Sequence, residues 1–311
     1  MTVLAIIGRA MRRALQWRLL VLSPIVLAAA ALATLLPVAH FLGGLLDHSA
    51  RWRELTEGLD SAALAQITKA VMTPAAAGLA TGIETSVVLA VLFAPLLAGA
   101  ALVVAGAGAR LRLRALLAGA AGYYGRMLRM QIAAVLPLGV ALILVSVAVA
   151  WESSASERAT SLAQTTMAGR ILWLVSGIAV FVAQLVVDAG RARLAVEPGR
   201  RSALFALGAG IKLVAKRPLR TVAVGLSATV AALGVAAVLL VLRQQIAQTG
   251  FAALVLALLL AQLAVAAIAW GHAARLCGLV EIARELVGSR VAVAPSAAPA
   301  DSAPIADPPE H

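Results

Sequence analysis

The hydrophobic positions of this chain fall in long unbroken runs, and the charged residues gather between them. Each run has about the 20 apolar residues with which an α-helix crosses a hydrocarbon core roughly 30 Å thick. A membrane barrel strand would instead alternate apolar and polar positions over about 10 residues. The pattern therefore predicts an all-α transmembrane helix bundle with six spans, at residues 19–43, 87–109, 132–150, 171–187, 221–242 and 250–270.

Composition agrees with this prediction, since 62% of the 311 residues are hydrophobic and only 13% are charged. Soluble domains carry about 25% charged residues. The transmembrane domain is expected to occupy residues 1–290. From residue 291 the chain is rich in Pro, Ala and Asp and predicts a disordered tail.

Basic residues occupy every second connecting segment. Four arginines precede the first span, five follow the second, and the strip 186–220 after the fourth holds eight Lys and Arg residues with two acids. The intervening connections are acidic or carry few charges. By the positive-inside rule, both termini and the basic connections lie in the cytoplasm. The formal charge of +12 then reflects membrane topology and not nucleic-acid binding.

Two further features of the composition indicate the kind of membrane and the positions of the span ends. Arginine outnumbers lysine 23 to 3 and alanine is abundant, which indicates a GC-rich bacterial genome and hence a bacterial inner membrane. Tryptophan side chains favour the headgroup region. All five fall at or just beyond predicted span ends, at Trp17, Trp52, Trp151, Trp173 and Trp270.

A repeated unit is visible where the even-numbered spans end. The triplet Ala-Arg-Leu recurs at 109–111, 192–194 and 274–276, about 82 residues apart. We expect three helical hairpins, each preceded by an amphipathic interfacial helix. In the first unit the apolar stripe is predicted at Leu4, Ile7, Met11 and Leu15. In the third it is predicted at Leu204, Leu207, Ile211 and Val214, opposite Gly208, Lys212 and Lys216.

An acid stands among arginines at the end of the fourth span. Asp188 and Arg191 are one helical turn apart, and an acid at the hydrocarbon boundary needs a partner. We expect a charge cluster at the cytoplasmic mouth of the bundle, formed by Asp188, Arg191, Arg193, Arg110 and Arg275. The alternative is an exposed ion pair of little energetic weight.

The same strip offers a second candidate site. Lys212 and Lys216 lie one turn apart on the polar face of a predicted amphipathic helix, with Arg200, Arg201 and Arg217 nearby. Such an arrangement suits anionic lipid headgroups, because each basic residue near an anionic surface contributes about 1 kcal/mol. The alternative is that these charges serve only to hold the loop in the cytoplasm.

Residues typical of enzyme sites are sparse. Glu84 lies beside the second span, His40 and His272 are isolated near span ends, and the single cysteine, Cys277, allows no disulfide within the chain. "DAGRAR" matches part of the CDP-alcohol phosphotransferase signature, but Ala189 replaces its glycine and the later acids are missing. No nucleotide-binding, hydrolase or metalloprotease motif occurs. The sequence predicts no enzyme, cofactor or metal site.

The six spans and the segment "VVDAGRARLAVEPGRRSALFALGAGIKLVAKRP" resemble a group of uncharacterised bacterial six-helix membrane proteins. That group is similar to the membrane domain fused to some glycerophosphodiester phosphodiesterases. The resemblance rests on Asp188, Arg191, Arg193 and the segment 197–201, and it implies no established activity. We expect a non-enzymatic membrane protein whose basic face binds anionic lipid or a partner protein. The alternative is a transporter or channel component for a small or amphiphilic solute.

Overall fold

The computed structural model of the chain describes residues 2–47, 77–107, 111–158, 162–197, 199, 202–246 and 250–293. Within them the chain forms helices and no strand: α1 (Val3–Ala14), α2 (Trp17–Asp47), α5 (Ala77–Gly106), α6 (Leu113–Arg158), α7 (Leu162–Val196), α8 (Ala203–Lys216), α9 (Pro218–Gln244) and α10 (Phe251–Val293). Six of these are long and apolar enough to cross a membrane. The predicted all-α bundle is confirmed, and the chain is a multi-pass membrane protein.

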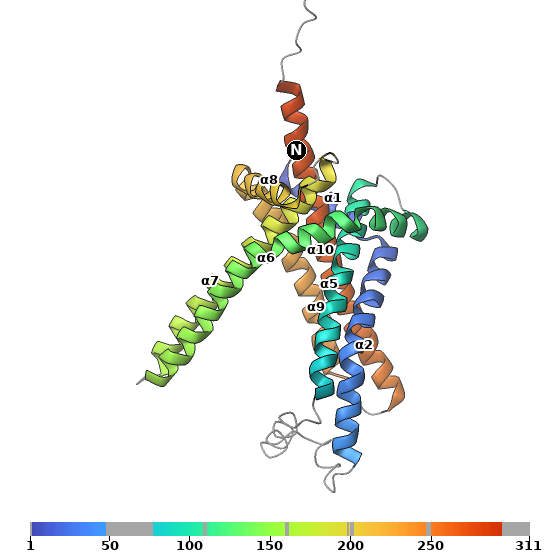
Figure 1. The fold of residues 1–311 in the computed structure, drawn as a ribbon, viewed down its shortest axis with the longest axis vertical. Helices are drawn as coiled ribbons and strands as arrows, with labels where there is room; N and C mark the ends of the chain where they lie inside the picture. The colour runs from blue at the N-terminus through green and yellow to red at the C-terminus, as the bar shows by residue number, and fades with distance from the viewer. Residues whose placement is uncertain are drawn as a thin grey trace, which may run out of the picture.

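The long helices form two groups (Figure 1). α2, α5, α9 and α10 stand side by side, while the far halves of α6 and α7 run together away from them as a hairpin. Apolar side chains on this hairpin are largely exposed, including Ile132 at 67% and Leu174 at 64%. Exposed apolar surface of this extent suits contact with lipid tails, which solvate it without cost.

Five of the six apolar segments in the structure are longer than the predicted spans, and the first has the predicted length. The fourth extends over Gly169–Val196 and the sixth over Phe251–Val287, so both continue past the predicted ends at 187 and 270. α6 joins the expected interfacial segment and the third span into one helix. The predicted tail from residue 291 lies almost entirely outside the described residues, since α10 continues to Val293.

Small residues allow the helices of the main group to approach closely. A methyl group added at Gly271 of α10 would lie 2.3 Å from Cβ of Ala232, and one at Gly278 would lie 2.4 Å from a methyl of Val224, both on α9. Gly82 of α5 likewise faces Pro37 of α2, at 2.7 Å from an added methyl. The alanine-rich core therefore reflects backbone proximity between neighbouring helices.

One side of α1 packs against the rest of the protein, and the other side is exposed. Its buried residues are Ile6, Ala10 and Ala14, while Leu4 is 80% exposed and Leu15 58% exposed. The predicted stripe is therefore only partly in contact with protein, because Leu4 and Leu15 are exposed whereas Ile7 and Met11 pack against buried residues of the core. Trp270 of α10 donates a 3.1 Å hydrogen bond to Met11 O, so this indole contacts α1.

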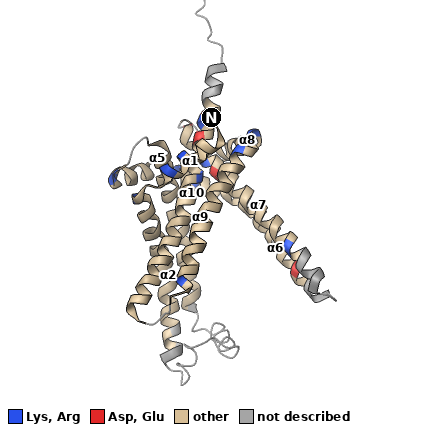
Figure 2. Cartoon of the chain, turned by 180° about the vertical axis from the view of Figure 1, so that it is seen from behind, with Lys and Arg blue, Asp and Glu red and all other residues tan. Residues whose placement is uncertain are grey.

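Charged residues gather at the end of the bundle that holds α1 and α8, called the charged end below (Figure 2). Here Glu281 of α10 accepts a 2.9 Å hydrogen bond from Arg9 of α1. One turn later, Glu285 lies 3.6 Å from Arg217 and 3.3 Å from Arg220, at the junction of α8 and α9. α10 thus anchors the short helices through ion pairs at the charged end.

Candidate functional site

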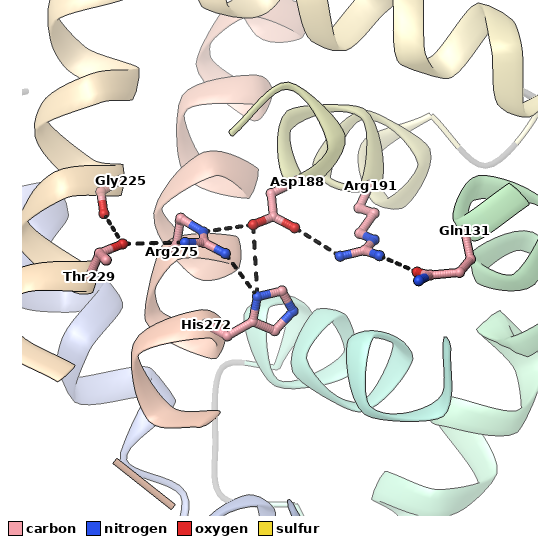
Figure 3. Close-up of polar contacts among 7 residues, drawn as sticks. All are labelled: Gln131, Asp188, Arg191, Gly225, Thr229, His272 and Arg275. Atoms are coloured by element: carbon pink, nitrogen blue, oxygen red, sulfur yellow. Dashed lines mark hydrogen bonds and ion pairs between the residues drawn. The ribbon is translucent and has the colours of Figure 1, made fainter. Parts of the chain in front are cut away.

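Asp188 is the centre of a buried charge cluster (Figure 3). Its side chain, on α7, is fully buried. Oδ1 accepts a 2.9 Å hydrogen bond from Nη1 of Arg191, and Oδ2 accepts a 2.6 Å hydrogen bond from Nε of Arg275 on α10. Nδ1 of His272 lies 3.8 Å from the same Oδ2. We call Asp188, Arg191, His272 and Arg275 the Asp188 cluster.

Neutral side chains extend the cluster to two further helices. Arg191 Nη2 donates a 2.6 Å hydrogen bond to Gln131 Oε1 on α6. Arg275 Nη1 donates a 3.2 Å hydrogen bond to Thr229 Oγ1 on α9, and that hydroxyl in turn donates to Gly225 O at 2.8 Å. Through Arg191 and Arg275, the hydrogen bonds around this carboxylate therefore connect α6, α7, α9 and α10 (Figure 3).

The charges of the Asp188 cluster do not cancel. Asp188 contributes one negative charge, while Arg191 and Arg275 each contribute a positive charge, with side chains only 7% and 12% exposed. Buried ions cost several kcal/mol each to desolvate, and pairing with good hydrogen bonds offsets that cost. The cluster therefore holds the helices together and leaves a surplus of positive charge inside the bundle.

The structure assembles only part of the predicted cluster. Asp188, Arg191 and Arg275 come together, whereas Arg193 pairs with Glu197 at 2.5 Å. Arg193 follows Asp188 by five residues and so points about 140° away around the helix. Arg110 lies outside the described residues.

The part played by His272, an isolated histidine in the sequence, does not follow from sequence reasoning. Arg275 Nη2 donates to His272 Nδ1 at 3.2 Å, so the two residues form a pair on one face of α10. Their spacing of three residues carries this signal, because side chains three apart on a helix are neighbours. Glu84, by contrast, is an exposed residue of α5.

The second predicted site falls at a pocket beside α8 with a volume of about 220 Å³. We call it the α8 pocket. Its basic members include Lys212 and Lys216, both exposed, and its apolar members include Leu204 and Phe205. The remaining lining residues are Arg193 of α7, Leu286 of α10, and Gly208, Ala209 and Leu213 of α8.

Glycine fixes the position of α8 against α7. A methyl group added at Gly210 would lie 2.6 Å from Gly190 N and 2.7 Å from Val186 O. The buried face of α8 is formed by Ala206, Leu207, Gly210 and Leu213. Leu204 and Ile211, predicted on the same stripe as Leu207, are 61% and 52% exposed, so the face of α8 that packs against α7 is not the whole predicted stripe.

The arginines expected around the lysines are not gathered in the α8 pocket. Arg217 instead pairs with Glu285 of α10 at 3.6 Å, at the end of α8. Arg200 and Arg201 lie outside the described residues. The basic character that the structure places at this pocket therefore comes from Lys212, Lys216 and Arg193.

Groupings typical of metal binding are missing from the described part of the chain, where no three His, Cys, Asp or Glu residues come together. Comparison of the chain with protein families, curated proteins and solved structures found no match. The resemblance to six-helix membrane domains therefore stays a prediction, and function has to be inferred from the residues themselves.

Proposed function

We propose that this chain is a non-enzymatic protein of the bacterial inner membrane, with both termini in the cytoplasm, that binds anionic lipid headgroups in the α8 pocket. The proposal rests on one observation: two exposed lysines and large exposed apolar side chains line the same pocket. A headgroup phosphate would lie near Lys212 and Lys216, and the acyl region would contact Leu204 and Phe205.

The two lysines differ from most arginines around them. Arg9, Arg217 and Arg220 are each paired with a glutamate of α10. Lys212 and Lys216, in the part of the chain that the structure describes, have no acidic partner within ion-pair distance. Two unneutralised cations one turn apart attract an anion, and an amphipathic helix at the membrane surface meets anionic lipid.

Exposed apolar residues favour a lipid over a soluble anion. Phe205 is 75% exposed and Leu219, at the start of α9, is 85% exposed. Lysine side chains can bury their apolar stems in the interface while their ammonium groups reach the phosphates. The charged end would then rest on the cytoplasmic leaflet, in agreement with the orientation that the loop charges predict.

Two alternatives follow from the same features. A partner protein with an acidic face could use the same lysines. Transport of a small or amphiphilic solute is the other alternative, but apart from Ser23 and His272 the cavity between α2, α5 and α10 is lined by apolar side chains and offers no polar path for a small solute. Ion or solute pathways through membranes are typically lined by polar or charged groups. Lipid binding therefore accounts better for the side chains at the charged end.

Lipid retention tests the proposal. Full-length protein in neutral detergent would be mixed with equal amounts of phosphatidylglycerol and phosphatidylcholine of the same chain length, and bound lipids counted by native mass spectrometry. We expect preferential retention of phosphatidylglycerol, lost in the double variant Lys212→Gln, Lys216→Gln.

The matched control removes two exposed arginines remote from α8, as Arg170→Gln, Arg243→Gln. This variant has the same net charge as the lysine variant and should retain phosphatidylglycerol as the natural protein does. Equal loss of the lipid in both variants, or equal retention of the two lipids by the natural protein, would refute a specific headgroup site.

A further inference from the structure

A second cavity, open to the surface, lies between α2, α5 and α10, with a volume of about 320 Å³. One wall comes from Leu19, Ser23 and Leu27 of α2, and another from Val265, Ala269 and His272 of α10. Its volume is at the lower end of the roughly 300–1,000 Å³ typical of small-ligand pockets. We call this cavity the α2–α10 groove.

The groove is elongated along the spans. Its α2 residues are spaced by four and its α10 residues by three or four, so each set forms one stripe along its helix. From Leu19 to Leu27 the rise is about 12 Å, at 1.5 Å per residue. A groove of this length and direction fits an extended acyl chain lying parallel to those of the surrounding bilayer.

His272 gives the groove a polar end. Arginine can only donate hydrogen bonds, so His272 Nδ1 must accept the one from Arg275 Nη2. The neutral ring then carries its proton on Nε2. Among the residues that the structure describes, Nε2 has no hydrogen-bond partner, and the side chain is 29% exposed. The ring therefore offers one N–H donor to an occupant of the groove.

The charge near His272 and the position of His272 across the membrane indicate which molecule would bind to its N–H group. The Asp188 cluster behind His272 has one acid and two arginines, so its surplus positive charge favours an anion. His272 follows Phe251, the first residue of α10, by about 32 Å along the helix, close to the roughly 30 Å thickness of the hydrocarbon core. The polar end of the groove would then lie at the boundary with the headgroups.

We propose that the α2–α10 groove binds a fatty-acid anion. Its single acyl chain lies between the stripes of α2 and α10, and its carboxylate accepts a hydrogen bond from His272 Nε2 beside the positively charged Asp188 cluster. This site is separate from the α8 pocket and does not depend on the function proposed for it.

Photo-crosslinking to the full-length protein in detergent tests this assignment. A fatty acid with a diazirine on its acyl chain should label peptides that contain 19–27 or 265–273. Ala269→Phe, which fills the groove from α10, should abolish this labelling, whereas Ala252→Phe, at an exposed position of the same helix, should preserve it. His272→Ala should weaken fatty-acid binding roughly tenfold, as expected for the loss of one hydrogen bond to a charged group.

Two companion probes identify the occupant. A photoactive fatty alcohol of equal length should bind more weakly, since it has no negative charge, and photoactive phosphatidylglycerol should label other peptides. Labelling of groove peptides by phosphatidylglycerol, equal binding of the alcohol, or unchanged labelling of Ala269→Phe would overturn the proposal. The double variant Lys212→Gln, Lys216→Gln should leave fatty-acid labelling intact, which separates this test from that of the α8 pocket.

Discussion

Arg275 donates a 2.6 Å hydrogen bond to Asp188, a residue 87 positions earlier in the chain. This contact joins α10, which belongs to the main group of spans, to α7, which belongs to the diverging hairpin. Asp188 also accepts from Arg191 and is fully buried, so one buried carboxylate connects both groups.

Replacing that carboxylate should destabilise the protein strongly. Asp188→Ala leaves Arg191 and Arg275 buried without their anion, and breaking a buried pair in this way costs about 3–5 kcal/mol. Glu152→Ala removes an exposed acid that accepts a 2.8 Å hydrogen bond from Trp173, so it should change stability by less than about 1 kcal/mol. Thermal unfolding of both variants in detergent provides the measurement. Equal melting temperatures would show that the cluster contributes little to stability.

A pair of glycines on one helix tests how α8 is positioned. Gly210→Ala places a methyl group within 2.6–2.9 Å of backbone atoms of α7, so α8 must shift or undock. Gly208→Ala, half a turn away, has open space, and alanine is the better helix former by about 1 kcal/mol. We expect a lower melting temperature for Gly210→Ala and an unchanged or higher one for Gly208→Ala. The reverse order would refute close packing at Gly190.

Orientation can be tested with single cysteines. Cys277 is buried among the helices and is unsuitable as a reporter, so a Cys277→Ala background is needed. In spheroplasts, a membrane-impermeant thiol reagent should label Gln245→Cys, which is exposed at the end of α9 remote from α8. It should label Ser202→Cys, exposed at the start of α8, only after permeabilisation. The opposite pattern would place the charged end outside the cytoplasm.

The number and kind of spans could be predicted because continuous apolar length identifies a membrane helix directly. The buried faces of α1 and α8 could not. Both helices contact protein on one side and, as we propose, lipid on another, and both environments accept apolar residues. In α8 this leaves Leu204 exposed while Ala206 and Gly210 are buried, since close approach to α7 requires small residues.

The Asp188 cluster was predictable only as far as helical geometry extends. Asp188 and Arg191 share a helix face three residues apart, so their pairing follows from spacing. The choice of Arg275 from another helix depends on tertiary packing, which a single sequence does not specify. Arg193 could have been set aside on geometry alone, because a spacing of five residues turns it away from Asp188.

The most direct test of the proposed headgroup site is the affinity of the full-length protein for phosphatidylglycerol, measured at several salt concentrations. Two lysines at about 1 kcal/mol each predict that Lys212→Gln, Lys216→Gln weakens binding roughly 30-fold at low ionic strength. Salt should narrow that difference, because exposed charges are screened over about 8 Å at physiological ionic strength. Binding that is independent of salt and equal in the natural protein and the variant would contradict lipid recognition by α8.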